Sequence, residues 1–96
     1  MELAALPPGA EEGFAPLCPD FVVELRSSSD RLAAVQAKMD EYIANGARLG
    51  WLIDPIERTV YVYRPAKPVE VIVGPAQMAG DPELPGFVLP LDDVWR

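Results

Sequence analysis

The sequence predicts an α/β fold in which a strand, a helix and a second strand are followed by a β-meander in one mixed sheet. A short β-type run at about 20–26 comes first, and a helical apolar pattern at about 30–45 follows it. Three further β-type runs, separated by turn residues, complete the pattern. The connection between the first two strands is long enough for a right-handed parallel βαβ unit.

The totals favour one small domain. The chain has 96 residues, half of them apolar, and 11 prolines that indicate short elements with many turns. Residues 1–18 read as an irregular lead-in, with Phe14 and Leu17 expected near the core, and residues 19–96 as the folded domain. No apolar run reaches the ~20 residues that cross a bilayer, so we expect a soluble, cytoplasmic protein.

Composition excludes several chemistries. The single cysteine, Cys18, cannot form an internal disulfide or a thiolate zinc cluster, and is interpreted as a small apolar filler. Because the chain has no histidine, histidine-based general base catalysis and histidine–metal ligation are also excluded. The formal charge of −7 opposes a broad nucleic-acid-binding surface, although a bound cation can reverse the local potential.

The first predicted strand contains most of the candidate functional side chains. Alternation separates a polar face, Asp20, Val22, Glu24 and Arg26, from an apolar face, Phe21, Val23 and Leu25. A carboxylate followed on the same face by a fixed cation suits a metal and a phosphate, which makes nuclease chemistry the first hypothesis. Asp20 lies ~13 Å along the strand from Glu24, too far for both to bind one ion.

The Ser27–Asp30 cluster predicts a turn that supplies the helix N-cap. One apolar stripe follows the helical repeat: Leu32, Val35, Met39, Tyr42 and Ile43. Lys38 lies on the flank of this stripe, from which its side chain can extend toward the strand edge. Asn45-Gly46 is a helix-stop signal.

The later elements are predicted from short runs. Residues 49–54 read as a strand covered on both faces, 59–63 as its hairpin partner and 69–73 as a third strand of the meander. Residues 74–90 are expected to form a proline-rich loop, and Leu91–Trp95 one helical turn. The aromatic residues in the β runs, Trp51, Tyr61 and Tyr63, are typical of a core or of cross-strand pairs, with base stacking as the alternative.

An ordered set of motifs resembles one known family: Asp20–Glu24, Ser27–Asp30, Lys38, Tyr42, Asn45-Gly46, Trp51–Pro55 and Val60–Pro65. This chain is similar, over roughly residues 14–96, to the putative restriction endonuclease family, which has a PD-(D/E)XK nuclease-like fold. Members are generally about twice as long and read Ser-Pro-Ser where this chain has Ser27-Ser28-Ser29. The resemblance implies a partial restriction-endonuclease-like core.

The resemblance also implies roles for individual residues. Glu24 falls at the acid of the (D/E)XK half-motif, a ligand for a divalent cation, expected to be Mg²⁺. Asp20 matches an acid at the start of the same strand and is the second candidate metal residue. Arg26 stands at the lysine position but cannot act as a general base. Lys38 matches a helix lysine that substitutes for it. The family's metal-binding aspartate lies in an earlier strand, and Glu2, Glu11 and Glu12 are not in that context.

Structural roles remain open alternatives for these residues: an ion pair between Glu24 and Arg26, a turn role for Asp20 and a surface position for Lys38. Two functions follow. The first is Mg²⁺-dependent hydrolysis of DNA by a truncated nuclease-like domain that works beside a missing N-terminal half or a second copy. The second is a non-catalytic remnant of the nuclease fold, which pairs or dimerises through an unpaired strand edge at about 20–26.

Overall fold

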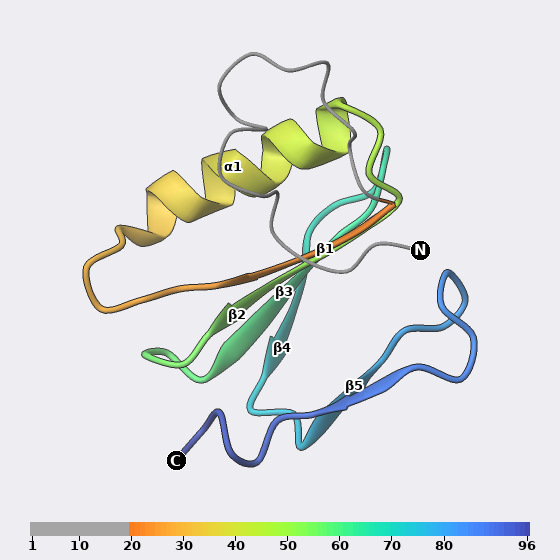
Figure 1. Ribbon diagram of the computed structural model, residues 1–96. Coiled ribbons are helices and arrows are strands. Elements are labelled where there is room, and N and C mark those ends of the chain that lie inside the picture. The colour runs from red at the N-terminus through yellow and green to blue at the C-terminus, as the bar shows by residue number, and fades with distance from the viewer. Residues whose placement is uncertain (1–19) are drawn as a thin grey trace, which may run out of the picture.

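The computed structural model describes residues 20–96, which form a four-stranded sheet, one helix and a separate two-stranded sheet. Figure 1 shows α1 on one face of the larger sheet and β5 on the other side. The predicted lead-in, with Phe14, Leu17 and Cys18, lies outside the described residues. No helix in the described part of the chain is long and apolar enough to span a membrane.

The predicted strand–helix–strand unit is present. β1 (Phe21–Leu25) is joined by α1 (Leu32–Ala44) to β2 (Leu49–Asp54), and β1 and β2 run parallel, with Phe21 opposite Leu49. The apolar runs of both strands explain this pairing, because β2 is buried along its whole length. The prediction of a strand covered on both faces is confirmed.

The meander follows in the predicted order. β3 (Thr59–Tyr63) pairs antiparallel with β2, and β4 (Glu70–Val73) pairs antiparallel with β3, so the sheet order is β1-β2-β3-β4. β1 and β4 are therefore the outer strands of this sheet within residues 20–96. The sheet is mixed, as the sequence predicted.

The helix begins differently from the prediction. The expected Ser27–Asp30 cap is wrong, because Arg31 occupies the N-cap position and makes no side-chain capping bond. Asp30 instead turns back and accepts hydrogen bonds from the backbone N–H (2.9 Å) and the hydroxyl (2.9 Å) of Ser27. Both bonds lower the pKa of Asp30, and the bond from the backbone N–H has the larger effect. The predicted turn is present, and it ends the strand rather than capping the helix.

Residues 74–90 are more ordered than the proline-rich composition predicted. They contain β5 (Gln77–Ala79) and β6 (Val88–Pro90), an antiparallel pair with Met78 opposite Leu89. These strands were missed because each is only three residues long and has no clear alternation. The predicted terminal helical turn is a hydrogen-bonded turn, in which the Trp95 N–H donates to the Leu91 carbonyl at 3.2 Å.

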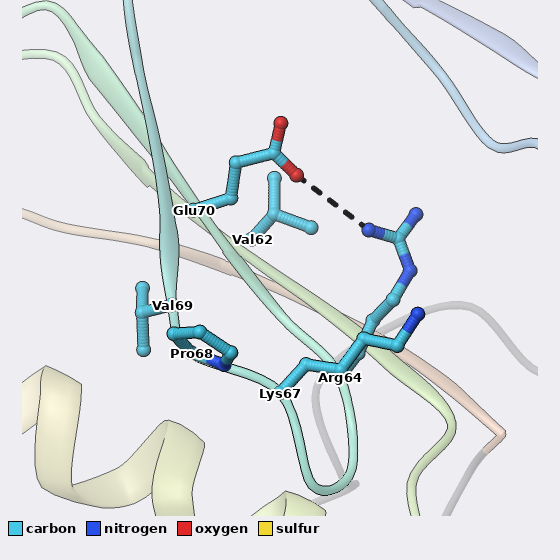
Figure 2. A pocket seen from close by; sticks show the side chains of 6 residues that line it. All are labelled: Val62, Arg64, Lys67, Pro68, Val69 and Glu70. Carbon is cyan, nitrogen blue, oxygen red and sulfur yellow. Dashed lines mark ion pairs between the residues drawn. The ribbon is translucent and has the colours of Figure 1, made fainter.

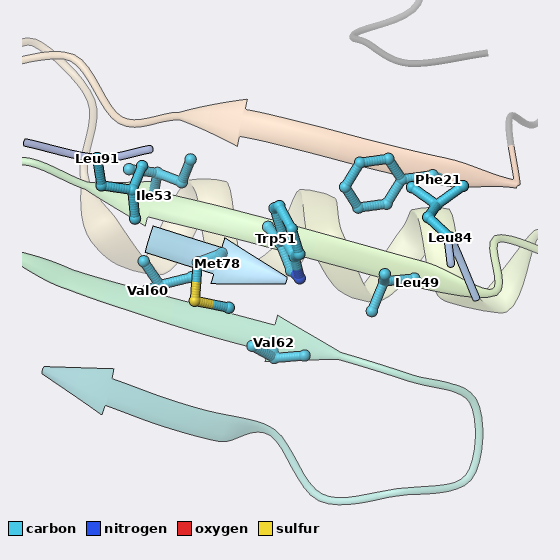
Figure 3. Close-up of a cluster of buried hydrophobic side chains, with 9 residues drawn as sticks. All are labelled: Phe21, Leu49, Trp51, Ile53, Val60, Val62, Met78, Leu84 and Leu91. Carbon is cyan, nitrogen blue, oxygen red and sulfur yellow. The ribbon is translucent and has the colours of Figure 1, made fainter. Parts of the chain in front are cut away.

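Two apolar clusters hold the layers together. The first lies on the sheet face opposite α1, under β5 and the C-terminal segment, and Figure 3 shows its members: Phe21, Leu49, Trp51, Ile53, Val60, Val62, Met78, Leu84 and Leu91. At its centre the Phe21 and Trp51 rings meet edge to face at 4.9 Å. Trp51 is 1% exposed, so its predicted core role is confirmed and it cannot stack on a base.

The second cluster joins α1 to the sheet. Val35, Met39 and Tyr42 are the buried helix residues, and they pack with Val22 and Leu52. Gly50 leaves the space for this contact, since a Cβ at that position would lie 2.7 Å from the terminal methyl of Met39. The helix therefore sits close above β1 and β2, which fixes where its polar flank meets the strand.

Candidate active site

Glu24 and Lys38 meet between β1 and α1. Glu24 points to the α1 side of the sheet, and its Oε2 lies 3.5 Å from the Lys38 Nζ. The Glu24 side chain is 13% exposed and that of Lys38 is 41% exposed, so the ammonium group is open to solvent while the carboxylate lies beneath it. The structure thus brings together the acid of the first strand and the lysine of the helix flank.

Tyr42 completes this group. Its hydroxyl donates to the same Glu24 oxygen at 3.2 Å. Lys38 and Tyr42 are four residues apart on α1 and therefore occupy one face of the helix, one turn from each other. The sequence placed Tyr42 on the apolar stripe and did not identify its contact with Glu24. The available signal was this four-residue spacing from Lys38.

Arg26 has a different partner from the one the sequence suggested. Its Nη1 donates to Asp54 Oδ2 at 2.8 Å, and its Nε donates to the Asp30 carbonyl at 3.3 Å. The suggested structural pair of Arg26 with Glu24 is therefore wrong. Asp54 is fully buried, and the Arg26 side chain is 16% exposed.

Asp54 also organises the turn after β2. Its Oδ1 accepts hydrogen bonds from the backbone N–H groups of Ile56 (3.0 Å) and Glu57 (3.3 Å). Arg26 and Asp54 thereby tie the end of β1 to the β2–β3 turn, beside the Glu24 strand position. The sequence indicated a strand-ending turn at Asp54. The available signal was the position of Asp54 at the end of an apolar run, because a carboxylate that is buried there needs a cationic partner.

Asp20 lies apart from this group. It precedes β1, is exposed, and its carbonyl accepts hydrogen bonds from the backbone N–H groups of Arg48 (2.9 Å) and Leu49 (3.2 Å). Glu24 stands near the other end of the same strand. The structure therefore does not bring the two acids together.

The described residues do not by themselves form a divalent cation site. Residues 20–96 contain no group of three or more histidine, cysteine, aspartate or glutamate side chains placed to hold a metal. Glu24 supplies one carboxylate, which is already paired with the Lys38 ammonium group, whereas Mg²⁺ in proteins is usually held by one or two free carboxylates together with substrate phosphates and several waters. The expected Mg²⁺ does not fit this donor set alone.

A second polar group surrounds a cavity of about 280 Å³ at the β3–β4 turn, lined by Val62, Arg64, Lys67, Pro68, Val69 and Glu70 (Figure 2). Arg64 is held there by Glu83, whose Oε2 accepts from its Nε at 2.8 Å, and by Glu70 at 3.7 Å. The hydrogen bond from Arg64 lowers the pKa of Glu83. Because two carboxylates already neutralise Arg64, this cavity is a poor phosphate site.

The architecture is similar to that of one solved structure. A solved structure from Anabaena variabilis, titled a putative nuclease, superposes with a TM-score of 0.68 at 32% sequence identity, covering 80% of this chain and 44% of that one. This chain thus spans less than half the length of the solved chain it matches. A search of curated proteins found no match.

The family follows from the sequence match. The model of the Uma2 family, described as "Putative restriction endonuclease", matches residues 2–92. This chain belongs to that family.

Proposed function

We propose that this chain takes part in the hydrolysis of DNA phosphodiester bonds, with Glu24 and Lys38 as the reacting side chains. The observation that carries the proposal is the 3.5 Å approach of the two side chains across the β1–α1 junction. Membership of the family described as "Putative restriction endonuclease" supports the same chemistry. The likeness to a nuclease structure extends over 80% of the chain.

In this proposal each side chain has one task. The exposed Lys38 ammonium binds a non-bridging oxygen of the scissile phosphate and neutralises the charge that grows on it in the transition state. Glu24, freed from Lys38 by the phosphate, accepts a hydrogen bond and then a proton from the attacking water. The water oxygen bonds to phosphorus while the bond from phosphorus to the leaving sugar oxygen breaks, and that oxygen takes a proton from solvent. Tyr42 holds the Glu24 carboxylate in place through its 3.2 Å hydrogen bond.

Arg26 is better suited to positioning than to phosphate binding. Its guanidinium is mostly covered and makes its closest contact with the buried Asp54. A phosphate would have to compete with a buried charge that cannot be left unpaired. We therefore assign phosphate binding to Lys38 and give Arg26 the task of fixing the strand end that carries Glu24.

Asp20 and Mg²⁺ have no part in the step described for Glu24 and Lys38. If a divalent cation takes part, Glu24 is the carboxylate that the described residues offer it, and its other ligands come from outside residues 20–96. Asp20 precedes the other end of β1 and would not bind the same cation as Glu24.

A cleavage assay tests the proposal. The chain and its Glu24→Gln variant are incubated with supercoiled plasmid in Mg²⁺, and in parallel with a chelator. We expect nicking by the parent chain and a loss of about 100-fold in Glu24→Gln, because the proton acceptor is removed. Glu41→Gln is the matched control, since Glu41 is an exposed acid on the same domain and should leave the rate unchanged. Equal rates in all three proteins, or no cleavage by any, would exclude the enzyme.

The alternative is a non-catalytic interaction module. Two observations favour it: the Glu24 carboxylate is already engaged by Lys38 and Tyr42, and β1 is an outer strand of the sheet within residues 20–96. Such a module would associate through β1 and show no cleavage. The cleavage assay above separates the two functions, because only the nuclease cleaves the plasmid.

A further inference from the structure

The outer strand β4 and the residue just before it present a row of exposed valines on the α1 side of the sheet. Val69, Val71 and Val73 are 43%, 56% and 77% exposed. The helix packs over β1, β2 and β3, and among residues 20–96 it does not cover β4. Exposed apolar side chains at alternate positions of an outer strand are typical of a strand that pairs with another.

The backbone of β4 is oriented for such pairing. The Gly74 N–H donates to the Arg58 carbonyl at 2.8 Å, which marks Arg58 and Gly74 as a hydrogen-bonded pair. Because these pairs alternate along an antiparallel ladder, Ile72 and Glu70 also direct their backbone groups toward β3. The N–H and C=O groups of the three valines therefore point away from the sheet.

Residues 69–73 carry little of the usual protection of an edge. Outer strands are commonly guarded by charged side chains, lysine above all, by proline or by a bulge. The register of β3 with β4 is continuous, and residues 69–73 contain neither lysine nor proline. Their one charged side chain, Glu70, is paired with Arg64 of its own chain at 3.7 Å. Pro68 and Pro75 stand just outside this segment and limit its length.

We propose that β4 of one copy pairs antiparallel with β4 of a second copy, around a two-fold axis at Val71. In this register Val71 faces its own counterpart, and Val69 faces Val73 of the other copy. All three outward-facing valines of each strand then lie in hydrogen-bonded pairs, and their side chains pack on one face. This proposal is independent of the nuclease function.

Charge and proline positions select this register. Centring the pair on Glu70 would set two carboxylates directly opposite each other, which is unfavourable. Centring it on Ile72 would place Val69 opposite Pro75, which has no N–H to donate. With the axis at Val71, Glu70 faces Ile72 of the other copy, and its charge is balanced by Arg64 of its own chain at 3.7 Å (Figure 2).

The size of the contact sets the strength of the association. A pair of strands this short buries less surface than the roughly 1,200 Å² of a stable interface, so we expect a dimer with a dissociation constant on the order of micromolar or weaker. Each copy carries a net charge of −7, and added salt should therefore strengthen the dimer by screening the repulsion.

Disulfide cross-linking tests the register. Val71→Cys places two thiols opposite each other at the axis, within the 4.4–6.8 Å Cα separation that a disulfide allows. Val73→Cys is the matched control: Val73 is more exposed, yet its two copies stand four residues apart along the strands, about 13 Å. In a Cys18→Ser background, we expect at least tenfold faster dimer formation by Val71→Cys. Equal rates would overturn the proposal.

Sedimentation velocity tests the dimer without cross-linking. The unmodified chain should shift from monomer to dimer as concentration rises, and Val71→Lys, which sets two ammonium groups face to face, should remain monomeric. Ile56→Lys is the control, because Ile56 is exposed to a similar degree (51%) on the β2–β3 turn. A chain that stays monomeric at millimolar concentration, or a Val71→Lys variant that dimerises like the parent, would refute the pairing.

Discussion

Arg26 at the end of β1 donates to Asp54 at the end of β2 across 2.8 Å, and Asp54 is fully buried. The same carboxylate accepts the backbone N–H groups that open the β2–β3 turn. This pair fixes the end of the strand on which Glu24 stands, two residues before Arg26.

Asp54→Ala should lower the free energy of unfolding by about 3 kcal/mol, because it leaves a largely covered guanidinium unpaired. Asp54→Asn should cost less, since its amide oxygen still accepts from the turn. Asp93→Ala is the control, because Asp93 forms an exposed pair with Arg96 at 3.1 Å. Urea denaturation of the three variants measures the difference. Similar losses in Asp54→Ala and Asp93→Ala would contradict the importance of the buried pair.

Gly50→Ala should destabilise the domain by about 1–3 kcal/mol through overpacking against Met39. The added Cβ would lie 2.7 Å from the end of a flexible side chain. Combining it with Met39→Ala should therefore cost less than the sum of the two single losses. A double-mutant cycle by thermal or urea unfolding measures this coupling, and strict additivity would show that α1 does not depend on the glycine.

Tyr63 should make the domain unstable in strong base. Burial, together with the charge of Asp40, raises the pKa of Tyr63 from 10.0 to about 12. The unfolded chain ionises first as pH rises past 10.0, so stability is full below that pH and falls by about 2 kcal/mol as pH approaches 12. Tyr63→Phe should remove that part of the pH dependence. The free energy of unfolding is measured between about pH 9 and pH 12 for both proteins. An equal fall with pH in the two would contradict the assignment to Tyr63.

Glu83 should stabilise the domain at neutral pH and not in acid. Its hydrogen bond from Arg64 lowers its pKa below the ordinary value of 4.5, so its contribution is present above pH 4.5 and lost as pH falls through the folded-state pKa. Glu83→Gln should cost about 1 kcal/mol at pH 7, discounted for partial exposure, and progressively less below pH 4.5. Exposed Glu57 is the control position for the same change. A constant difference at all pH values would rule out the ion pair as its source.

Most of the fold could be predicted from the strong sequence patterns. The runs at 49–54 and 59–63 match β2 and β3 to the residue, because the first is nearly continuous in apolar residues, the second is β-branched and aromatic, and turn residues follow both. The helix was placed within two residues at each end by its apolar stripe. The β5–β6 pair was missed, since its strands owe their order to the packing of Met78 and Leu89 on the cluster around Trp51 rather than to local pattern.

The candidate site was harder to derive. Glu24 and Lys38 could be placed on facing elements from alternation and helix flank alone. The partner of Arg26 could not, because 28 residues separate it from Asp54 and only the parallel register of β1 with β2 brings them together. The Ser27–Asp30 cluster has the composition of both a tight turn and a helix N-cap. It forms the turn, in which the Ser27 N–H donates to the Asp30 carboxylate.

The most direct measurement is the coupling of Glu24 and Lys38 in cleavage. Rates are compared for the parent chain, Glu24→Gln, Lys38→Met and the double variant, with Lys67→Met as the control on the chain's other lysine. If the two side chains act on one phosphate, each single change should cost about 100-fold and the double variant little more. Losses that multiply in the double variant, or a Lys67→Met loss as large as that of Lys38→Met, would contradict a shared site.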